Sequence, residues 1–244
     1  MSQQIGAVCQ HPLIVAQIEK SPYHIDQPYF IEHPGLVALN PHERSARFED
    51  GSVEHSIDAI VLCTGYAYRF PFLKSIAPGI ESEGVRALPL YKHIFHEQHP
   101  TLAFIETPEL IVPFPLAECQ AAVVARVWSN RLELPPRLKM QEWREDVIRD
   151  RGAGRGFHAL KPPSDLEYMK KLYEWCCNAS EPPKSGQGAS GKTPRKWDEE
   201  VCWLRMTAAE MKKAFNAQGM HRVNLTTYEE LGFHFDGGGS SVKS

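Results

Sequence analysis

The chain has 244 residues, with 27 basic and 30 acidic side chains and a formal net charge of −3, a length that fits one large domain or two small ones. This balance gives no strongly basic surface for nucleic acid or an anionic membrane, and no run approaches the ~20 apolar residues of a membrane-spanning helix. The six cysteines show neither metal-ligand spacing nor a compact disulfide framework, so we expect reduced thiols in a cytoplasmic protein.

The first half of the chain favours short strands. Residues 1–28 have weak periodicity and are expected to form a poorly defined N-terminal segment. Residues 58–64 contain a continuous apolar run from Ala59 to Cys63, a pattern typical of a strand buried on both faces in the middle of an α/β sheet. Other short strands are predicted at residues 29–32, 36–40, 46–49, 101–105 and 110–112.

The second half is helical in pattern. A helix is predicted to begin at Pro115, because proline is favoured in a first helical turn, and Glu118 complements the positive end of the helix dipole. One face of this helix is mostly apolar at helical spacing: Leu116, Gln120, Val123, Val124, Val127, Trp128 and Leu132. Further helices are predicted over residues 138–149 and from Ser164 onward.

The composition changes after residue 178. Residues 179–196 are rich in proline, glycine, serine and lysine, and predict a flexible linker. Residues 197–235 are expected to form a small helical segment, with short helices starting near Thr207 and Thr226. The glycine- and serine-rich residues 236–244 predict a disordered tail.

Residues 186–193, within the linker, match the phosphate-binding P-loop pattern Gly-x-x-x-x-Gly-Lys-Thr. A working P-loop must leave a buried strand and enter a helix, so that aligned amides hold the phosphates. Here two prolines precede the pattern and Pro194 follows it, which excludes that context. We therefore interpret these residues as linker.

Three histidines, His93, His96 and His99, recur at a spacing of three with Glu97 among them. Such a set has the residue types of a metal site. The competing interpretation, a surface strand or loop, is favoured, and we predict no metal. No serine or cysteine nucleophile can be assigned either, because nothing fixes a Ser-His-Asp or Cys-His arrangement.

Two runs carry the most information about function. The first begins at Asp58 and reads Asp-Ala-Ile-Val-Leu-Cys-Thr-Gly-Tyr-Ala-Tyr-Arg-Phe-Pro-Phe-Leu, with Thr64-Gly65 at the end of the apolar stretch. A small Thr-Gly pair there lets the backbone approach a flat or anionic ligand. The second run comprises Tyr-Lys-His-Ile-Phe from Tyr91, Pro-Thr-Leu-Ala-Phe from Pro100 and Val-Pro-Phe-Pro-Leu-Ala-Glu-Cys-Gln-Ala-Ala from Val112.

Together these runs resemble the C-terminal half of the flavin-containing monooxygenases of the fungal type. The resemblance implies an α/β fold, in which residues 29–178 form the C-terminal part of a Rossmann-like, three-layer FAD/NAD(P)-binding domain completed by C-terminal helices. It also implies that FAD and NADPH are the cofactors and that the substrate is a small nucleophile, oxygenated at an amine nitrogen or a sulfide sulfur.

The resemblance also assigns site residues. Thr64 and Gly65 match the interdomain Thr-Gly motif that links the two nucleotide sites, and the helix beginning at Pro115 would face the flavin with Gln120 as a polar contact. A plain core helix is an equally open interpretation of that segment. No catalytic residue is assigned, because in this family the cofactor carries the chemistry.

Two departures bear on activity. No Gly-x-Gly-x-x-Gly fingerprint occurs among residues 1–58, although a dinucleotide-binding fold needs one to hold the pyrophosphate. Glu106 also stands where the family usually has a glycine close to the flavin. We therefore expect a truncated chain that is active only in a longer form or with a complementary chain. The alternative is a non-catalytic remnant that associates with itself or with a partner.

Overall fold

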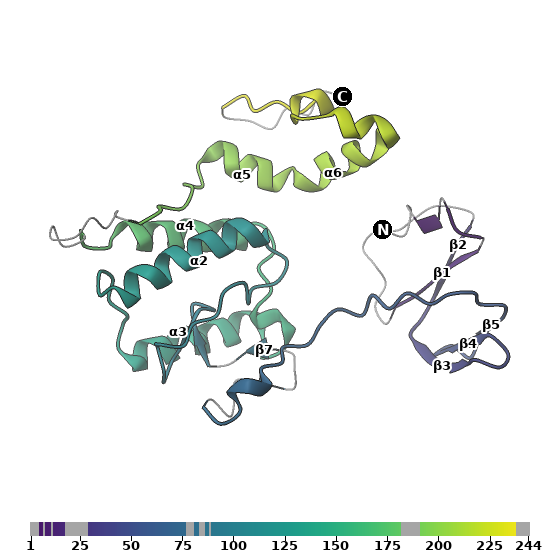
Figure 1. Ribbon diagram of the computed structural model, residues 1–244, viewed down its shortest axis with the longest axis horizontal. Coiled ribbons are helices and arrows are strands. Elements are labelled where there is room, and N and C mark those ends of the chain that lie inside the picture. Colours follow the sequence, from purple (N-terminus) through teal and green to yellow (C-terminus); the bar gives the residue numbers. More distant parts are fainter. Residues whose placement is uncertain are drawn as a thin grey trace. The chain divides into compact units, whose positions relative to one another are not determined.

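The computed structural model describes residues 5–6, 8–10, 12–17, 29–76, 81–82, 86–87, 89–181 and 191–237 (Figure 1). The chain divides into two compact units, Met1–Gly65 and Tyr66–Ser244. The division falls inside residues 29–178, which the sequence assigns to one domain, so that assignment stays a prediction. Among the described residues, no helix is both long and apolar enough to cross a bilayer.

The Met1–Gly65 unit is built from short strands. β1 (Leu13–Ala16) pairs in parallel with β2 (Phe30–His33), as Figure 1 shows. β3 (Leu36–Asn40), β4 (Ser45–Phe48) and β5 (Val53–Glu54) form an antiparallel meander. The strands predicted at residues 29–32, 36–40 and 46–49 are thus confirmed to within one residue.

The small core of this unit lies against β4. Ala46 and Phe48 are buried, and the Phe48 ring stacks on the His33 imidazole with a centroid separation of 4.1 Å. The His33 ring lies 3.0 Å from a Glu54 carboxylate oxygen and 3.0 Å from the Ser52 hydroxyl, so both of its nitrogens have partners. Aromatic stacking and these hydrogen bonds join β2, β4 and β5.

The buried strand predicted at residues 58–64 is wrong for this structure. No described residue from 55 to 70 belongs to a strand, and Ile60, Val61 and Leu62 are 48%, 66% and 75% exposed. A continuous apolar run becomes a central strand only when neighbouring strands pair with its edges and helices cover its faces. The described residues supply neither for this run.

The Tyr66–Ser244 unit is mainly helical. The chain enters it through a 3-10 turn, η1 (Pro71–Leu73), and the paired strands β6 (Glu81–Ser82) and β7 (Arg86–Ala87). A second hairpin, β8 (Leu90–Tyr91) with β9 (Phe95–His96), precedes the helices. The strands predicted at residues 101–105 and 110–112 are wrong. The first range holds one isolated bridge, from Ala103 to Phe95, and the second holds none, although its neighbour Glu109 bridges to Ala159.

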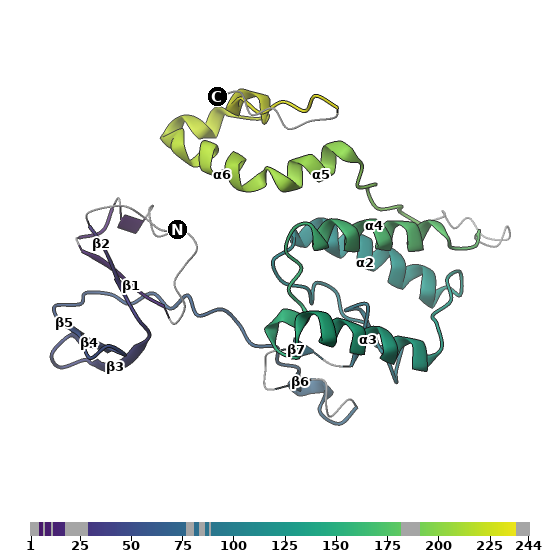
Figure 2. The same cartoon turned by 180° about the vertical axis from the view of Figure 1, so that it is seen from behind.

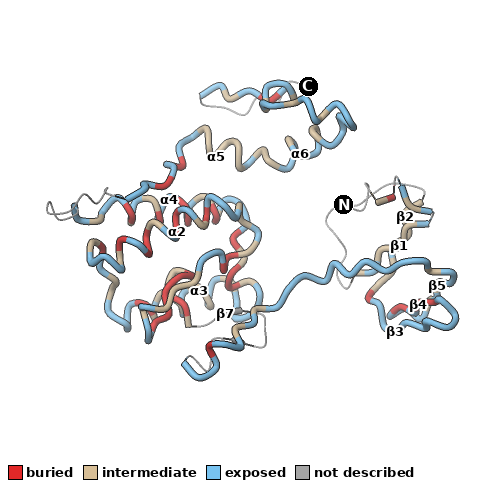
Figure 3. Tube along the Cα trace, viewed as in Figure 1, coloured by how far each residue is buried: buried red, intermediate tan, exposed pale blue. Residues whose placement is uncertain are grey.

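Three helices surround the core of this unit. They are α2 (Pro113–Trp128), α3 (Arg137–Arg151) and α4 (Ser164–Cys177), with the turn η2 (Arg155–Phe157) before α4. α2 and α4 lie side by side in Figures 1 and 2, and Figure 3 shows buried residues on both. Leu116, Cys119 and Val123 of α2 pack in one apolar cluster with Met169 and Leu172 of α4.

The C-terminal residues contain helices, while their assignment to a separate segment over 197–235 stays a prediction. α5 (Glu199–Met206) and α6 (Ala208–Ala217) are followed by two 3-10 turns, η3 (Gly219–Asn224) and η4 (Glu229–Leu231). Asp198 caps α5 by accepting a hydrogen bond from the Val201 amide at 3.1 Å. Trp197 is 5% exposed and belongs to the main core cluster, so this segment is attached to the rest of the unit.

Candidate functional site

Four non-glycine residues of positive φ lie on the hairpin and on the chain that leads to α2. They are Lys92 (φ 52°), His93 (φ 57°), Glu106 (φ 63°) and Leu110 (φ 64°). Lys92 and His93 are the central residues of the turn between β8 and β9, which is closed by the Ile94 amide donating to the Tyr91 carbonyl at 3.0 Å. Left-handed backbone costs free energy in residues with a Cβ, and such strain gathers at functional sites.

The start of α2 has few free donors. Val112 is the N-cap, has extended backbone and makes no side-chain capping bond. The helix begins at Pro113 rather than at the predicted Pro115, and both prolines lack an N–H, so Phe114 alone offers one among the first three residues. Glu118 lies beyond the first turn, where its carboxylate accepts from Lys192 Nζ at 2.7 Å. The helix dipole remains, but the first turn has few amide donors for an anion.

Gln120 joins three segments of the unit. Its Oε1 accepts a hydrogen bond from the Glu106 amide at 2.8 Å, and its Nε2 donates to the Tyr168 hydroxyl of α4 at 2.9 Å. The Tyr168 hydroxyl in turn donates to the Lys92 carbonyl at 2.7 Å. Gln120 is fully buried, so this network holds two of the left-handed residues in place. Direct contact between Gln120 and a flavin stays a prediction.

A second set of bonds runs beside the first. Thr107, which is buried, donates through Oγ1 to the His93 carbonyl at 2.6 Å, and the Tyr68 hydroxyl donates to the Thr107 carbonyl at 2.5 Å. Sequence reasoning missed Tyr68, Thr107 and Tyr168 as members of the site. The only local signal was the polar end of a tyrosine within the apolar stripe of α4, since a buried tyrosine hydroxyl needs a partner.

His93 and His158 form a buried pair of imidazoles. Their Nδ1 atoms lie 3.1 Å apart, so one ring donates and the other accepts when both are neutral. Burial, followed by the nearby His158, holds the pKa of His93 well below its ordinary value of 6.5. His93 is therefore a neutral interior residue, whereas the sequence placed it in a surface strand or loop.

This burial predicts a pH-dependent stability. In the unfolded chain His93 binds a proton below pH 6.5, whereas in the folded chain it resists protonation, so stability is lost as the pH falls from 6.5 toward the lowered pKa. The contribution of one such proton is about 1.4 kcal/mol per pH unit. We expect His93→Asn, which cannot ionise and tolerates left-handed backbone, to flatten the slope between pH 7 and 5.

Urea unfolding followed by tryptophan fluorescence measures this slope for the Tyr66–Ser244 unit alone, because all five tryptophans lie in that unit. His221→Asn changes an exposed imidazole and serves as the matched control. An equal slope in wild type and His93→Asn would contradict the prediction.

Glu106 has the backbone conformation that a glycine takes most readily. A non-glycine residue in this region costs about 1–2 kcal/mol, and glycine costs about 0.5–1 kcal/mol through its greater freedom when unfolded. We therefore expect Glu106→Gly to stabilise the unit by about 0.5–1 kcal/mol in urea titrations. Glu133→Gly, at an exposed loop residue that is not of positive φ, is expected to destabilise by about 0.5–1 kcal/mol. Destabilisation by both variants would refute the strain at Glu106.

Thr64 and Gly65 lie at the end of the extended segment that closes the first unit. Both are exposed, and Gly65 has φ 79°, a conformation that suits glycine. The structure therefore leaves this pair accessible within the first unit, and its role at a cofactor stays a prediction.

The motifs set aside in the sequence occupy other surroundings. His96 is buried and stacks on His99 with a centroid separation of 5.1 Å, and no metal-ligand cluster of three or more side chains occurs among the described residues. Residues 182–190, most of the P-loop-like pattern, lie outside the described residues. Gly191 to Trp197 form no helix, in agreement with the rejection of a P-loop.

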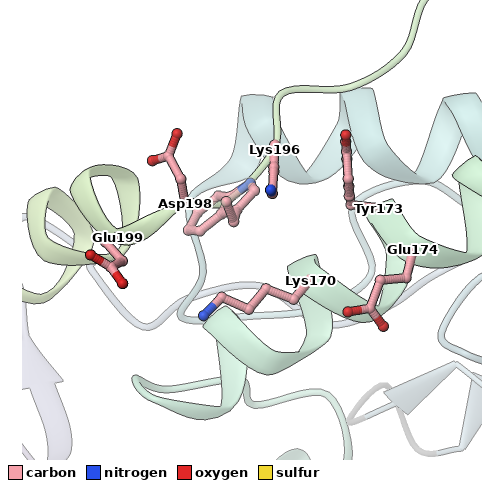
Figure 4. Close-up of a pocket in the computed structure, with 7 residues that line it drawn as sticks. Lys170, Tyr173, Glu174, Lys196, Asp198 and Glu199 are labelled. Carbon is pink, nitrogen blue, oxygen red and sulfur yellow. The ribbon is translucent and has the colours of Figure 1, made fainter.

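One depression within the second unit has a lining of mixed charge. A depression of about 380 Å³ lies between α4 and the residues that enter α5, and Figure 4 shows its charged lining. Lysines and carboxylates of opposite sign alternate there: Lys170, Glu174, Lys196, Asp198 and Glu199. Because the charges offset one another, this depression has no clear preference for an anionic cofactor.

Comparison with known proteins decides the family. The family model described as "FMO-like: Flavin-binding monooxygenase-like" matches residues 36–175, more than half of the chain. The chain belongs to the flavin-binding monooxygenase family. The resemblance read from the two runs of sequence is thereby confirmed, and the family is one of oxidoreductases that use a flavin.

The aligned region takes in most of this chain but less than half of each relative. The thiol-specific monooxygenase of Saccharomyces cerevisiae is 32% identical over 182 residues, which are 71% of this chain and 38% of the yeast protein. The flavin-containing monooxygenase ustF2 of Aspergillus flavus is 27% identical over 201 residues, 78% of this chain and 39% of the relative. The chain thus spans under two fifths of these flavin-binding monooxygenases.

A solved structure supports the fold. The S-allyl-L-cysteine S-oxygenase of Allium sativum superimposes with a TM-score of 0.57 and 26% sequence identity, covering 88% of this chain and 44% of the S-oxygenase. With the mixture of strands and helices described above, this confirms the expected fold class, part of a Rossmann-like α/β domain with C-terminal helices.

Proposed function

We propose that this chain forms part of a flavin-dependent, NADPH-using monooxygenase that oxygenates soft nucleophiles, with sulfur as the favoured acceptor atom. The observation that carries the proposal is the family match over residues 36–175, which includes Thr64, Gly65 and Gln120. The preference for sulfur is inferred from two relatives, a thiol-specific monooxygenase and an S-allyl-L-cysteine S-oxygenase.

In this proposal Thr64 and Gly65 contact FAD, and the start of α2 faces its flavin. Gly65 has exposed backbone and no Cβ, so a flat cofactor can approach it closely. The positive end of the α2 dipole would stabilise negative charge on the cofactor. The buried Gln120 amide would fix the position of the Glu106 turn through its hydrogen bond to the Glu106 N–H. FAD reduced by NADPH supplies the oxygen-transfer chemistry, and the protein orients the reactants and excludes water.

The residues present would supply some of the contacts that FAD needs, but not all of them. The two oriented ends of the Gln120 amide are already bonded within the protein, and residues 1–58 contain no Gly-x-Gly-x-x-Gly to hold a pyrophosphate. We propose that the remaining contacts come from sequence that corresponds to the unmatched part of the relatives, carried by a longer form of the chain or by a complementary chain.

The test is flavin retention, measured by visible absorption after FAD is added and the excess removed. We expect the 244-residue chain alone to retain little flavin. When it is fused to the part of the yeast thiol-specific monooxygenase that lies outside the matched region, we expect retained flavin and NADPH oxidation that depends on an added thiol. A fusion that folds but retains no flavin would overturn the proposal.

Gly65→Val makes the same test residue-specific. We expect this variant of the fusion to retain at least tenfold less flavin, because a branched side chain would meet the cofactor and strain the left-handed backbone. Gly51→Val is the matched control, since Gly51 is also exposed and has φ 83° but lies in the β4–β5 turn. Equal losses in the two variants would assign the effect to backbone strain alone.

The second candidate is a non-catalytic remnant that acts through association. It is favoured by Glu106, whose carboxylate stands where the family usually has a glycine beside the flavin, and by the exposed apolar run Ile60-Val61-Leu62. This alternative predicts that the fusion stays colourless while the purified chain self-associates in size-exclusion chromatography. Flavin retention by the fusion would refute it.

A further inference from the structure

A second pocket, of about 260 Å³, lies among the β8–β9 turn, α3 and α4. Its walls include three half-buried aromatic rings, with Tyr91 edge-to-face against Trp143 at 5.5 Å and against Trp175 at 6.0 Å between ring centroids. Apolar side chains of α3 and α4 complete the walls. The volume is below the roughly 300–1,000 Å³ of pockets that hold drug-sized ligands, so a ligand here would be small.

The charges around this pocket are unbalanced. Lys92, Arg151 and Lys171 line it, against the single carboxylate of Glu167. Glu167 lies 3.8 Å from Lys171, and Arg151 contacts Asp150 at 3.4 Å. Among the described residues Lys92 makes no ion pair, and burial followed by the nearby Lys171 lowers its pKa.

Lys92 already fills the place that a cationic ligand would take. Its ammonium lies 5.3 Å from the centre of the Trp143 ring and 5.8 Å from that of Tyr91, within the range of cation–π attraction. An anion entering the pocket would meet this ammonium at close range, with Lys171 at the rim. The body of the ligand would rest on the tryptophan rings and the apolar wall.

From these contacts we propose that the pocket binds a small aromatic carboxylate, paired with Lys92 and stacked against Trp143 and Trp175. This proposal does not depend on the proposed function. Two interactions would stabilise the bound ligand: the ion pair between its carboxylate and the partly desolvated Lys92 ammonium, and burial of its aromatic ring.

The test uses isothermal titration of the 244-residue chain with phenylacetate, with its neutral isostere phenylacetamide and the cation phenethylamine as ligand controls. We expect phenylacetate to bind with a dissociation constant of about 1 mM, typical of so small a ligand, and to change the tryptophan fluorescence. The amide is expected to bind at least tenfold more weakly and the amine not measurably. No heat of binding at phenylacetate concentrations up to about 10 mM, tenfold above that constant, would overturn the proposal.

Variants locate the site. Lys92→Met keeps the apolar stem and should weaken phenylacetate binding at least tenfold. Lys171→Met should weaken binding about threefold. Because Lys171 is an exposed helical residue away from the β8–β9 turn, a loss in this variant does not reflect misfolding of that turn. Lys170→Met is the matched control, because Lys170 is the neighbouring lysine of α4 but faces the other depression (Figure 4). A loss in Lys170→Met equal to that in Lys92→Met, or displacement of phenylacetate by FAD, would refute the assignment.

Discussion

Replacing Arg205 by methionine is expected to lower the free energy of unfolding of the Tyr66–Ser244 unit by about 3–5 kcal/mol. Arg205 of α5 donates through Nε to an Asp165 carboxylate oxygen at 2.5 Å, and through Nη2 to the Leu110 carbonyl at 3.1 Å. The Asp165 side chain is fully buried and that of Arg205 is 17% exposed. Removing the guanidinium leaves a buried carboxylate whose charge is uncompensated, and desolvation makes that state costly.

A double-mutant cycle separates the ion pair from the loss of packing. Asp165→Asn keeps an acceptor for the Leu166 amide, which lies 2.8 Å from Asp165 Oδ1. In the Arg205→Met background we expect Asp165→Asn to recover most of the lost stability, because the unpaired charge is gone. If Asp165→Asn adds a further loss in that background, the pair is not the source of the effect.

Arg149→Met is the matched control for Arg205→Met. Arg149 forms a helical ion pair with Asp146 at 2.8 Å, but both side chains are more than 60% exposed. Exposed pairs contribute about 0–1 kcal/mol, so this variant should change the unfolding free energy little. Urea titrations followed by tryptophan fluorescence compare the two arginines under the same conditions.

The Asp165–Arg205 pair also explains how the C-terminal helices are held. It joins α5 to the first turn of α4 and to the Leu110 carbonyl that precedes α2. In Arg205→Met we therefore expect limited proteolysis to cut within residues 197–235 before it cuts α2 or α4, because α5 keeps only its apolar contacts. Cleavage at the same rate as in wild type would show that the apolar contacts of Trp197 and α5 anchor the segment without the ion pair.

Local patterns predicted those parts of the structure that local forces decide. The strand at residues 36–40 and the helices α2, α3 and α4 follow hydrophobic period, proline placement and turn residues, all of which are read over a few positions. Residues 58–64 failed on the same reasoning. Their composition indicates a central strand, but a strand forms only with partners, and the described residues provide none.

The site was predictable only in part, for a similar reason. The sequence motifs in the two runs identified the flavin-binding monooxygenases and drew attention to Gln120 and Glu106. It did not reveal that Gln120 faces Tyr168, 48 residues further along the chain, because no local period encodes that pairing. The burial of His93 beside His158 likewise depends on segments 65 residues apart.

The Gln120 network carries the second large expected effect. Gln120→Met fills a similar volume without polar atoms, so the Glu106 amide loses its acceptor and the Tyr168 hydroxyl loses one donor. A buried group left unpaired costs about 1–3 kcal/mol, and we expect a total loss near 2 kcal/mol in the unfolding free energy of the Tyr66–Ser244 unit. Gln218→Met, at an exposed glutamine that follows α6, should change it by less than about 0.5 kcal/mol.

Coupling to Tyr168 distinguishes a network from a set of independent bonds. Tyr168→Phe removes the partner of Gln120 Nε2 and the donor to the Lys92 carbonyl, and we expect it to cost about 1–3 kcal/mol. Because the two variants share one hydrogen bond, the double variant should be less destabilised than the two single losses added together, by about 1 kcal/mol. Strict additivity would mean that Gln120 holds the Glu106 turn without help from α4. Coupling would show that the left-handed turns at Lys92 and Glu106, on either side of the network, are fixed by one buried amide.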